Sequence, residues 1–182
     1  TSGSPDSRDC AYSASFGLRT GIRWSCLTAS IARPKAEHVN SIPSAPAFAQ
    51  YPDGPTGDIS VYADDQGNSC DVAANGGGSL VTAFVVHKFS DGGSATGCRF
   101  KVTLPANLTY LSFSTTFVPI GQANSDLSLG YGVCISETTS LGSVLALSGV
   151  ASPACSYISV VAADNFSDPI TTDCSFGEYK VE

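Results

Sequence analysis

Histidine, the usual starting point for a catalytic argument, is scarce in this sequence. It has two histidines, His38 and His87. His87 stands among strand-forming residues in the run Val85 to Phe89, so we expect a structural imidazole, half-buried or facing the surface, and not a general base. Serine is plentiful, but no Gly-x-Ser-x-Gly turn presents one as a nucleophile. The sequence therefore predicts no catalytic residues and favours a protein that is not an enzyme.

Neighbouring carboxylates occur at Asp64 and Asp65, followed by Gln66-Gly-Asn-Ser-Cys-Asp71. Several oxygen ligands in a glycine-containing loop can hold Ca²⁺. The spacing differs from an EF-hand loop because the terminal Glu is missing, and Asp, Gly and Asn also form ordinary turns by bonding their own backbone. Both interpretations of this loop stay open; the turn is the simpler one, and we predict no metal site and no cofactor.

Cysteine is unusually frequent and is not arranged for zinc. None of the cysteines forms a Cys-x-x-Cys pair or stands near a histidine at zinc-finger spacing, so disulfides are the better interpretation. Disulfides persist in oxidising surroundings, which predicts an exported protein. The seven candidates are Cys10, Cys26, Cys70, Cys98, Cys134, Cys155 and Cys174.

Pairing cannot be deduced from spacing, but two bonds are favoured. We expect Cys155–Cys174, which brackets a candidate strand, and Cys10–Cys26 in the N-terminal part, with Cys70, Cys98 and Cys134 sharing one further bond. The odd count leaves one thiol over. That thiol is either buried and free or bonded outside this chain.

Other features also agree with export. The Asn-x-Ser/Thr motifs at Asn107 and Asn165 are candidate N-glycosylation sites. Methionine is absent, as in a processed product, and the small-residue stretch 44–50 reads as an extended linker. We expect a secreted, extracellular or cell-surface protein.

Length and composition bound the remaining possibilities. A chain of 182 residues with 42% hydrophobic residues can build one core, with an arm attached. The net charge of −7 repels phosphate backbones, so we expect no nucleic-acid partner. No apolar stretch approaches the roughly 20 residues that cross a bilayer, so we expect no transmembrane segment.

The first part of the chain differs from the rest. Residues 1–57 contain six prolines, which fix φ and remove backbone donors, so this part is expected to be an extended arm. Its one exception is the run from Gly21 to Ala32, which fits either a strand or a short helix.

Residues 58–182 instead show short apolar or alternating runs bounded by turn residues. No helical stripe is sustained, which makes crossover helices and a parallel sheet improbable. We therefore predict an all-β fold, an antiparallel β-sandwich of immunoglobulin-like or jelly-roll type, with the extended arm before it. About eight strands are expected, at 59–63, 80–89, 98–104, 108–120, 127–133, 141–147, 157–162 and 176–181.

Alternation assigns faces to some of these residues. Phe100, Val102 and Leu104 should face the core, opposite Arg99, Lys101 and Thr103. The same logic makes most of the aromatics that might form a sugar platform into core residues. These are Tyr110, Phe113, Phe117 and Tyr131.

Charge divides unevenly along the chain. Residues 1–50 carry five basic and three acidic residues, a net +2, and the remaining residues carry −9. Opposite signs favour contact between the two parts, within one molecule or head-to-tail between copies.

Five motifs together resemble a known kind of domain. They are Gly57-Asp-Ile-Ser-Val-Tyr-Ala-Asp64, Phe84-Val-Val-His-Lys-Phe89, Ala106-Asn-Leu-Thr-Tyr-Leu111, Gly130-Tyr-Gly-Val-Cys134 and Pro153-Ala-Cys-Ser-Tyr-Ile158. As a set they are similar to uncharacterised secreted bacterial β-sandwich domains, and the resemblance covers residues 57–182. It implies an exported immunoglobulin-like or cohesin-like sandwich without known catalytic residues, so no site is carried over from it.

Two functions follow as expectations. The first is a non-catalytic extracellular structural subunit of a filament or layer, in which the arm of one copy binds the body of the next; its partners are copies of itself. The alternative is a secreted carbohydrate-binding or adhesion module, with glycans as partners and the arm as a linker.

Overall fold

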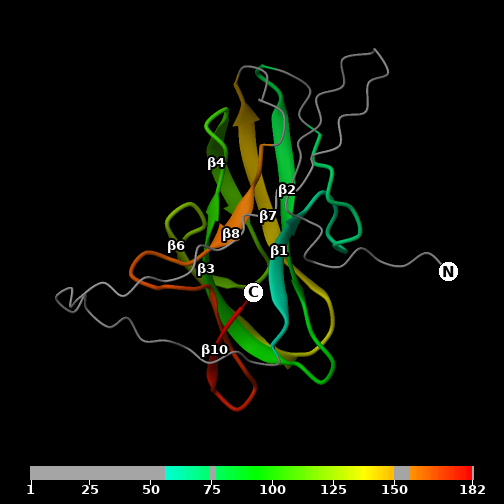
Figure 1. Cartoon of the computed structure of the whole chain (residues 1–182), viewed down its shortest axis with the longest axis vertical. Helices are drawn as coiled ribbons and strands as arrows, with labels where there is room; N and C mark the ends of the chain where they lie inside the picture. Colours follow the sequence, from blue (N-terminus) through cyan, green and yellow to red (C-terminus); the bar gives the residue numbers. More distant parts are fainter. Residues whose placement is uncertain (1–55, 74–76, 150–155, 182) are drawn as a thin grey trace, which may run out of the picture.

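Ten strands form the part of the chain that the computed structural model describes, residues 56–73, 77–149 and 156–181. All of their pairings are antiparallel, and these residues contain no helix, so the all-β prediction is confirmed (Figure 1). The strands are β1 (Asp58–Tyr62), β2 (Leu80–Lys88), β3 (Ala95–Thr103), β4 (Leu108–Ser114), β5 (Val118–Gln122), β6 (Asp126–Ile135), β7 (Thr139–Ser148), β8 (Ser159–Val161), β9 (Ile170–Thr172) and β10 (Glu178–Lys180).

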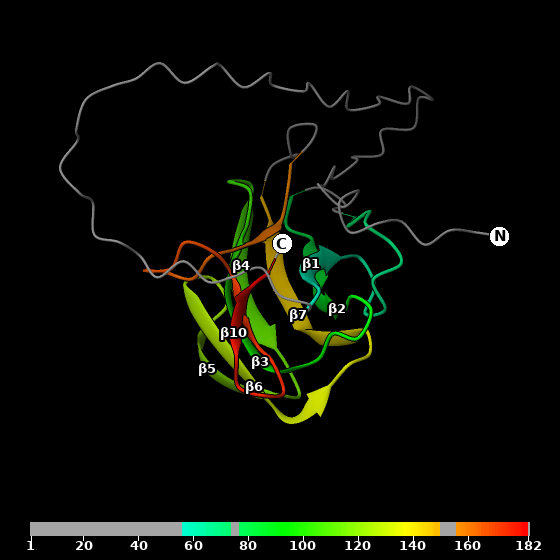
Figure 2. The same ribbon diagram turned by 60° about the horizontal axis from the view of Figure 1, so that its bottom comes forward.

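The strands build two sheets that face each other. One has the order β1-β2-β7-β4, and the other has the order β10-β9-β3-β6-β5, with β8 pairing the far end of β3. Figure 2 shows β3, β5, β6 and β10 on one side and β1, β2 and β7 on the other. The predicted antiparallel sandwich is therefore the observed fold, and the predicted arm lies almost wholly outside the described residues.

Apolar side chains from both sheets meet between them. In β3, Phe100 and Val102 are buried, whereas Arg99 and Lys101 are partly exposed on the other face, as the alternation predicted. In the facing sheet, Val85 of β2 and Val144 of β7 are also buried in this core. The core is thus the inner face of each sheet, as expected for two sheets packed face to face.

Most of the predicted strand ends differ from the observed ones by one to three residues, and two departures are larger. The run 108–120 is split, because Thr115 Oγ1 donates to Leu141 O at 2.6 Å and accepts from the Phe117 N–H at 3.1 Å, which turns the chain between β4 and β5. The strand β9 was not predicted, because it is three residues long and follows Pro169. Across the described ranges, no helix is long and apolar enough to span a membrane.

Candidate functional site

The strand register decides which side chains share the outer face of the larger sheet. Residues paired across antiparallel strands lie on the same face. Following the pairs from β5 to β10, one row contains Pro119, Leu129, Cys98, Thr171 and Tyr179, and it faces the core. The next row along the strands must therefore face outward. It contains Val118, Gly130, Gly97, Thr172 and Glu178.

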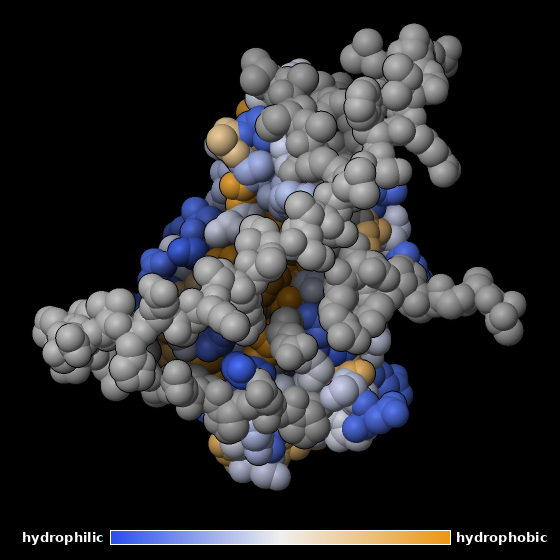
Figure 3. Space-filling view, viewed as in Figure 1, coloured by the Kyte–Doolittle hydropathy of each residue, from blue (hydrophilic) through white to orange (hydrophobic). Residues whose placement is uncertain are grey.

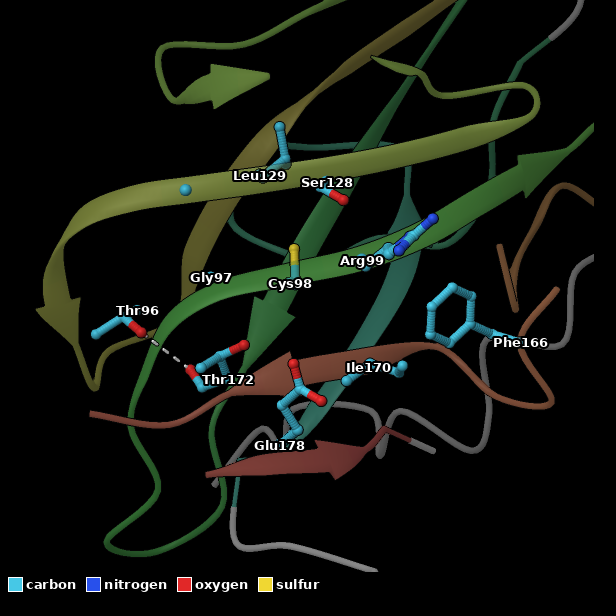
Figure 4. A pocket seen from close by; sticks show the side chains of 11 residues that line it. Thr96, Gly97, Cys98, Arg99, Ser128, Leu129, Phe166, Ile170, Thr172 and Glu178 are labelled. Carbon is cyan, nitrogen blue, oxygen red and sulfur yellow. Dashed lines mark hydrogen bonds between the residues drawn. The ribbon is translucent and has the colours of Figure 1, made fainter. Parts of the chain in front are cut away.

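Two glycines face each other at the centre of the outward row. Gly97 of β3 pairs with Gly130 of β6, so two adjacent strands carry no side chain at that point. The result is an open trough of about 400 Å³ on the outer face, bounded by β6, β3, β9 and β10. Figure 4 shows it with Arg99 and Phe166 together at one end and Thr96 and Thr172 at the other.

An ion pair and an aromatic ring close one end of this trough. The Arg99 Nε–H donates to Asp126 Oδ1 at 2.8 Å, and its second guanidinium nitrogen pairs with the other carboxylate oxygen. That hydrogen bonding lowers the pKa of the Asp126 carboxyl. The guanidinium carbon lies 4.2 Å from the centre of the Phe166 ring, within cation–π range. The charge of Arg99 is therefore largely neutralised where it meets the trough.

Small polar side chains line the rest of the trough. Thr96 Oγ1 donates to the backbone oxygen of Asp173 at 3.1 Å, which fixes the wall beside β9. The side chains of Ser128, Thr172 and Glu178 make no hydrogen bond within the described residues. Two hydroxyls and one carboxylate are thus left to meet solvent or a ligand.

A second polar group lies inside the sandwich, around His87. The ring is fully buried, with Nε2 2.7 Å from the backbone oxygen of Thr56 and Nδ1 3.0 Å from the Tyr131 hydroxyl. A carbonyl oxygen only accepts, so Nε2 carries the proton and Nδ1 accepts from the Tyr131 O–H. Burial lowers the pKa of His87 to about 4. The expectation of a half-buried or surface-facing imidazole was wrong about exposure, because a backbone carbonyl and a phenol satisfy the ring in the core.

A buried thiol lies next to this hydrogen-bonded pair. Cys98 is close enough to the Tyr131 phenol for each group to influence the pKa of the other. Burial raises the pKa of Cys98 to about 12. On the other side, Thr171 Oγ1 donates to Thr56 Oγ1 at 2.6 Å. The hydrogen bonds of His87 and Thr56 tie the two sheets together, and at neutral pH the buried imidazole and thiol are both uncharged.

The cysteine predictions are only partly right. Cys174 bonds to Cys134, with Cα atoms 5.5 Å apart, so the expected Cys155–Cys174 bond is wrong. Cys70 is disulfide-bonded and Cys98 is free and buried, so the expected bond within the set of Cys70, Cys98 and Cys134 is wrong as well. The buried position of Cys98 also removes it as a link to another chain. Cys10, Cys26 and Cys155 lie outside the described residues.

The observed disulfide anchors the β9–β10 hairpin that forms one wall of the trough. It joins the end of β6 to the residue two positions beyond β9. Asp173 Oδ1 accepts the backbone N–H groups of Ser175 and Gly177, at 2.8 and 2.7 Å, which shapes the hairpin loop. The spacing of the cysteines did not predict this bond, because the bond depends on β9 pairing with β3, and these strands are far apart in the sequence.

The acidic loop is built as a turn. Asp64 Oδ1 accepts the backbone N–H groups of Gln66 and Asn68 at 3.0 Å, and its Oδ2 accepts that of Ser69 at 2.6 Å. These bonds lower the pKa of Asp64, with the one from Asn68 as the largest cause. Asp65 is exposed. The geometry is that of the turn interpretation, and no cluster of three or more metal-ligating side chains occurs among the described residues.

The remaining candidates fall in separate places. Asn165 is exposed on a turn with φ +73°, whereas Asn107 is half-buried just before β4. The four aromatics considered for a sugar platform, Tyr110, Phe113, Phe117 and Tyr131, belong to the core or pack against it, as predicted. The aromatic at the trough is Phe166, which the sequence did not single out; it is the middle residue of the Asn165 motif.

Comparisons with known proteins add no assignment to this geometry. No protein-family model, no curated protein and no solved structure matches the chain. The resemblance of residues 57–182 to secreted bacterial sandwich domains therefore stays a prediction.

Proposed function

We propose that this protein is a non-catalytic extracellular structural subunit, and that copies assemble when the N-terminal segment of one adds a strand to the β4 edge of the next. The observation that supports it is the unprotected state of β4. This strand pairs only with β7 in the described structure, and its sequence Leu108-Thr-Tyr-Leu-Ser-Phe-Ser114 has no charge, proline or glycine. Such an edge is a template for another strand unless something covers it.

The other edges of the two sheets carry protective features. In β5, Pro119 lacks a backbone N–H and Gly121 adopts φ +91°. β10 is three residues long and carries Glu178 and Lys180. β1 begins with Asp58 and lies next to β8. Short strands, charge and proline are the usual means of preventing edge pairing, and β4 has none of them.

Side chains along β4 suit a covering strand. Leu111 is 46% exposed and stands at an irregularity, since Tyr110 and Ser112 pair with consecutive residues of β7. Leu147 of β7 and Leu80 of β2 are exposed nearby, opposite each other in the register. Hydrophobic surface shows in Figure 3 where Figure 1 places β4.

The N-terminal segment contains a run whose alternation would suit such a strand. In Cys26-Leu-Thr-Ala-Ser-Ile-Ala32, Leu27, Ala29 and Ile31 alternate with Thr28 and Ser30. The net +2 of residues 1–50 also favours contact with the acidic remainder of a neighbouring copy.

Electron microscopy and light scattering of the full chain test this proposal. We expect polymers from the full chain, monomers after deletion of residues 1–50, and monomers from Leu111→Lys, which places a charge on β4. Ile120→Lys is the matched control, because Ile120 is 72% exposed on the β5 edge; it should still polymerise. A monomeric full chain overturns the proposal, and polymers that survive the deletion refute the role of the N-terminal segment.

A further inference from the structure

We propose that the outer-face trough binds a neutral carbohydrate chain that lies across β6, β3, β9 and β10. This inference goes beyond assembly, because it concerns the larger sheet and uses no residue of β4. It rests on the floor of the trough, its polar groups and its charge.

The floor is shaped by the absence of side chains. Gly130 and Gly97 lie opposite each other, so β6 and β3 carry no side chain over a short width; Gly130 is exposed, whereas Gly97 is buried. A Cβ on Gly97 would lie 2.8 Å from Leu129 O, so glycine is required there by the close approach of β6. A Cβ on Gly130 would have no heavy atom within 4 Å, so the space above it is open. Over Gly130 the floor has no side chain, which lets a ring approach the sheet closely.

The polar groups match a ligand that carries many hydroxyls. Ser128, Thr172 and Glu178 come from three different strands, line the same trough, and make no side-chain hydrogen bond within the described residues. Hydroxyls both donate and accept, and a carboxylate accepts strongly from a hydroxyl. Phe166 adds an aromatic ring at one end, held in place by Arg99. A small number of placed polar groups beside apolar surface is typical of small-molecule sites.

The charge of the trough argues against an anionic ligand. Asp126 neutralises Arg99, and Glu178 remains as a carboxylate on the opposite wall. The chain as a whole carries −7. Phosphates and acidic sugars are therefore repelled, and a neutral ligand is favoured over them.

The shape favours an elongated ligand. The outward row crosses five strands, which is about 19 Å at the usual spacing between strands. At the β5 end it carries Val118, which is 67% exposed and offers an apolar contact. A volume of about 400 Å³ that is open to solvent accommodates part of a chain and lets the rest continue beyond the site.

Calorimetric titration of the full chain with a panel of neutral hexasaccharides, gluco-, xylo-, manno- and N-acetylglucosamine-based, tests the proposal. We expect at least one to bind, and Gly130→Leu, which fills the open space above the floor, to weaken it by about tenfold or more. Thr82→Leu is the matched control, because Thr82 is exposed on the outer face of the other sheet, and it should bind as the parent does. No binding by any panel member up to about 10 mM, or equal binding by Gly130→Leu, overturns the proposal.

Two further measurements keep the test independent of that one variant. On titration of the parent protein, amide NMR shifts should move at Gly97, Gly130 and Thr172; shifts confined to other residues contradict the site. Glu178→Gln should weaken sugar binding to a similar degree at low and high salt. Binding of spermidine alone, lost in Glu178→Gln and in high salt, would assign the trough to a cationic ligand and overturn the proposal.

Discussion

His87 Nδ1 lies 3.0 Å from the Tyr131 hydroxyl, so an imidazole of one sheet and a phenol of the other are joined by a hydrogen bond inside the core. Since the Thr56 carbonyl fixes the tautomer through Nε2, this contact has one direction, from phenol to imidazole. Protonation of His87 would point a second N–H donor at the hydroxyl that now donates to Nδ1, and this bond would be lost in its present direction. The neutral state of His87 is therefore part of the fold.

Folding stability should fall as the pH falls from about 6.5 to about 4, because the pKa of His87 is about 4 in the folded protein and 6.5 when unfolded. Above this window neither the folded nor the unfolded state binds the proton. Within it only the unfolded state binds the proton, which lowers the free energy of unfolding by about 3 kcal/mol at pH 4. Urea unfolding at several pH values measures this loss. Asp64 and Asp126, whose pKa values are lowered, add their own losses below this window.

The matched variant for this measurement is His87→Gln, whose amide cannot be protonated in this range. It should be less stable than the parent at pH 7.5, and its stability should change much less between pH 6.5 and pH 4. An unchanged slope in His87→Gln would mean that another group causes the loss.

Cys98 should be unreactive while the protein is folded. Its pKa of about 12 leaves almost no thiolate at neutral pH, and the sulfur is buried. Labelling with a thiol reagent should therefore proceed at the rate of unfolding and become fast in urea. Cys98→Ala should show one labelled thiol fewer in urea. Rapid labelling of Cys98 without denaturant would contradict its place in the core.

Loss of the Cys134–Cys174 bond should destabilise the chain without changing the fold. Its sequence separation of 40 residues corresponds to about 4 kcal/mol of loop-closure free energy, less any change in the native state. The double variant Cys134→Ser with Cys174→Ser should melt well below the parent in thermal unfolding. An unchanged melting temperature would show that the β9–β10 hairpin is held by β-pairing alone.

Two glycines in the β5–β6 hairpin should respond differently to alanine. At Gly121 the φ of +91° is strained for any other residue and a Cβ would overlap the Asp126 carbonyl, so Gly121→Ala should cost about 1 to 3 kcal/mol. Gly130→Ala meets open space and should change stability by less than about 0.5 kcal/mol. Chemical unfolding measures the loss of stability in each variant. Equal losses would mean that the backbone conformation at one of these glycines is not the one described.

The sequence predicted what local patterns determine. Alternation placed Phe100 and Val102 in the core and Arg99 outside, because period two is a property of a single strand. The same reasoning identified Tyr110 and Tyr131 as core-associated residues. The short strand β9 escaped, because three residues after a proline carry too little pattern.

The trough and the buried hydrogen-bonded chain depend on pairings between distant segments. Gly97 and Gly130 become a floor only when β3 and β6 pair in one register, since a shift by one residue would bring Leu129 or Tyr131 to the outer face. His87 becomes buried only because Thr56 and Tyr131 reach its two nitrogens from other parts of the chain. No spacing in the sequence encodes either arrangement.

Hydrogen–deuterium exchange on polymers and on the monomer lacking residues 1–50 tests the central claim, that β4 accepts a strand from a neighbouring copy. A new strand would bond the outward-facing backbone amides among residues 108–114, so their exchange should slow by at least about tenfold in polymers, with little change in residues 118–122 of β5. Equal exchange across 108–114 in both samples, or protection that rises in β5 instead, would contradict the account.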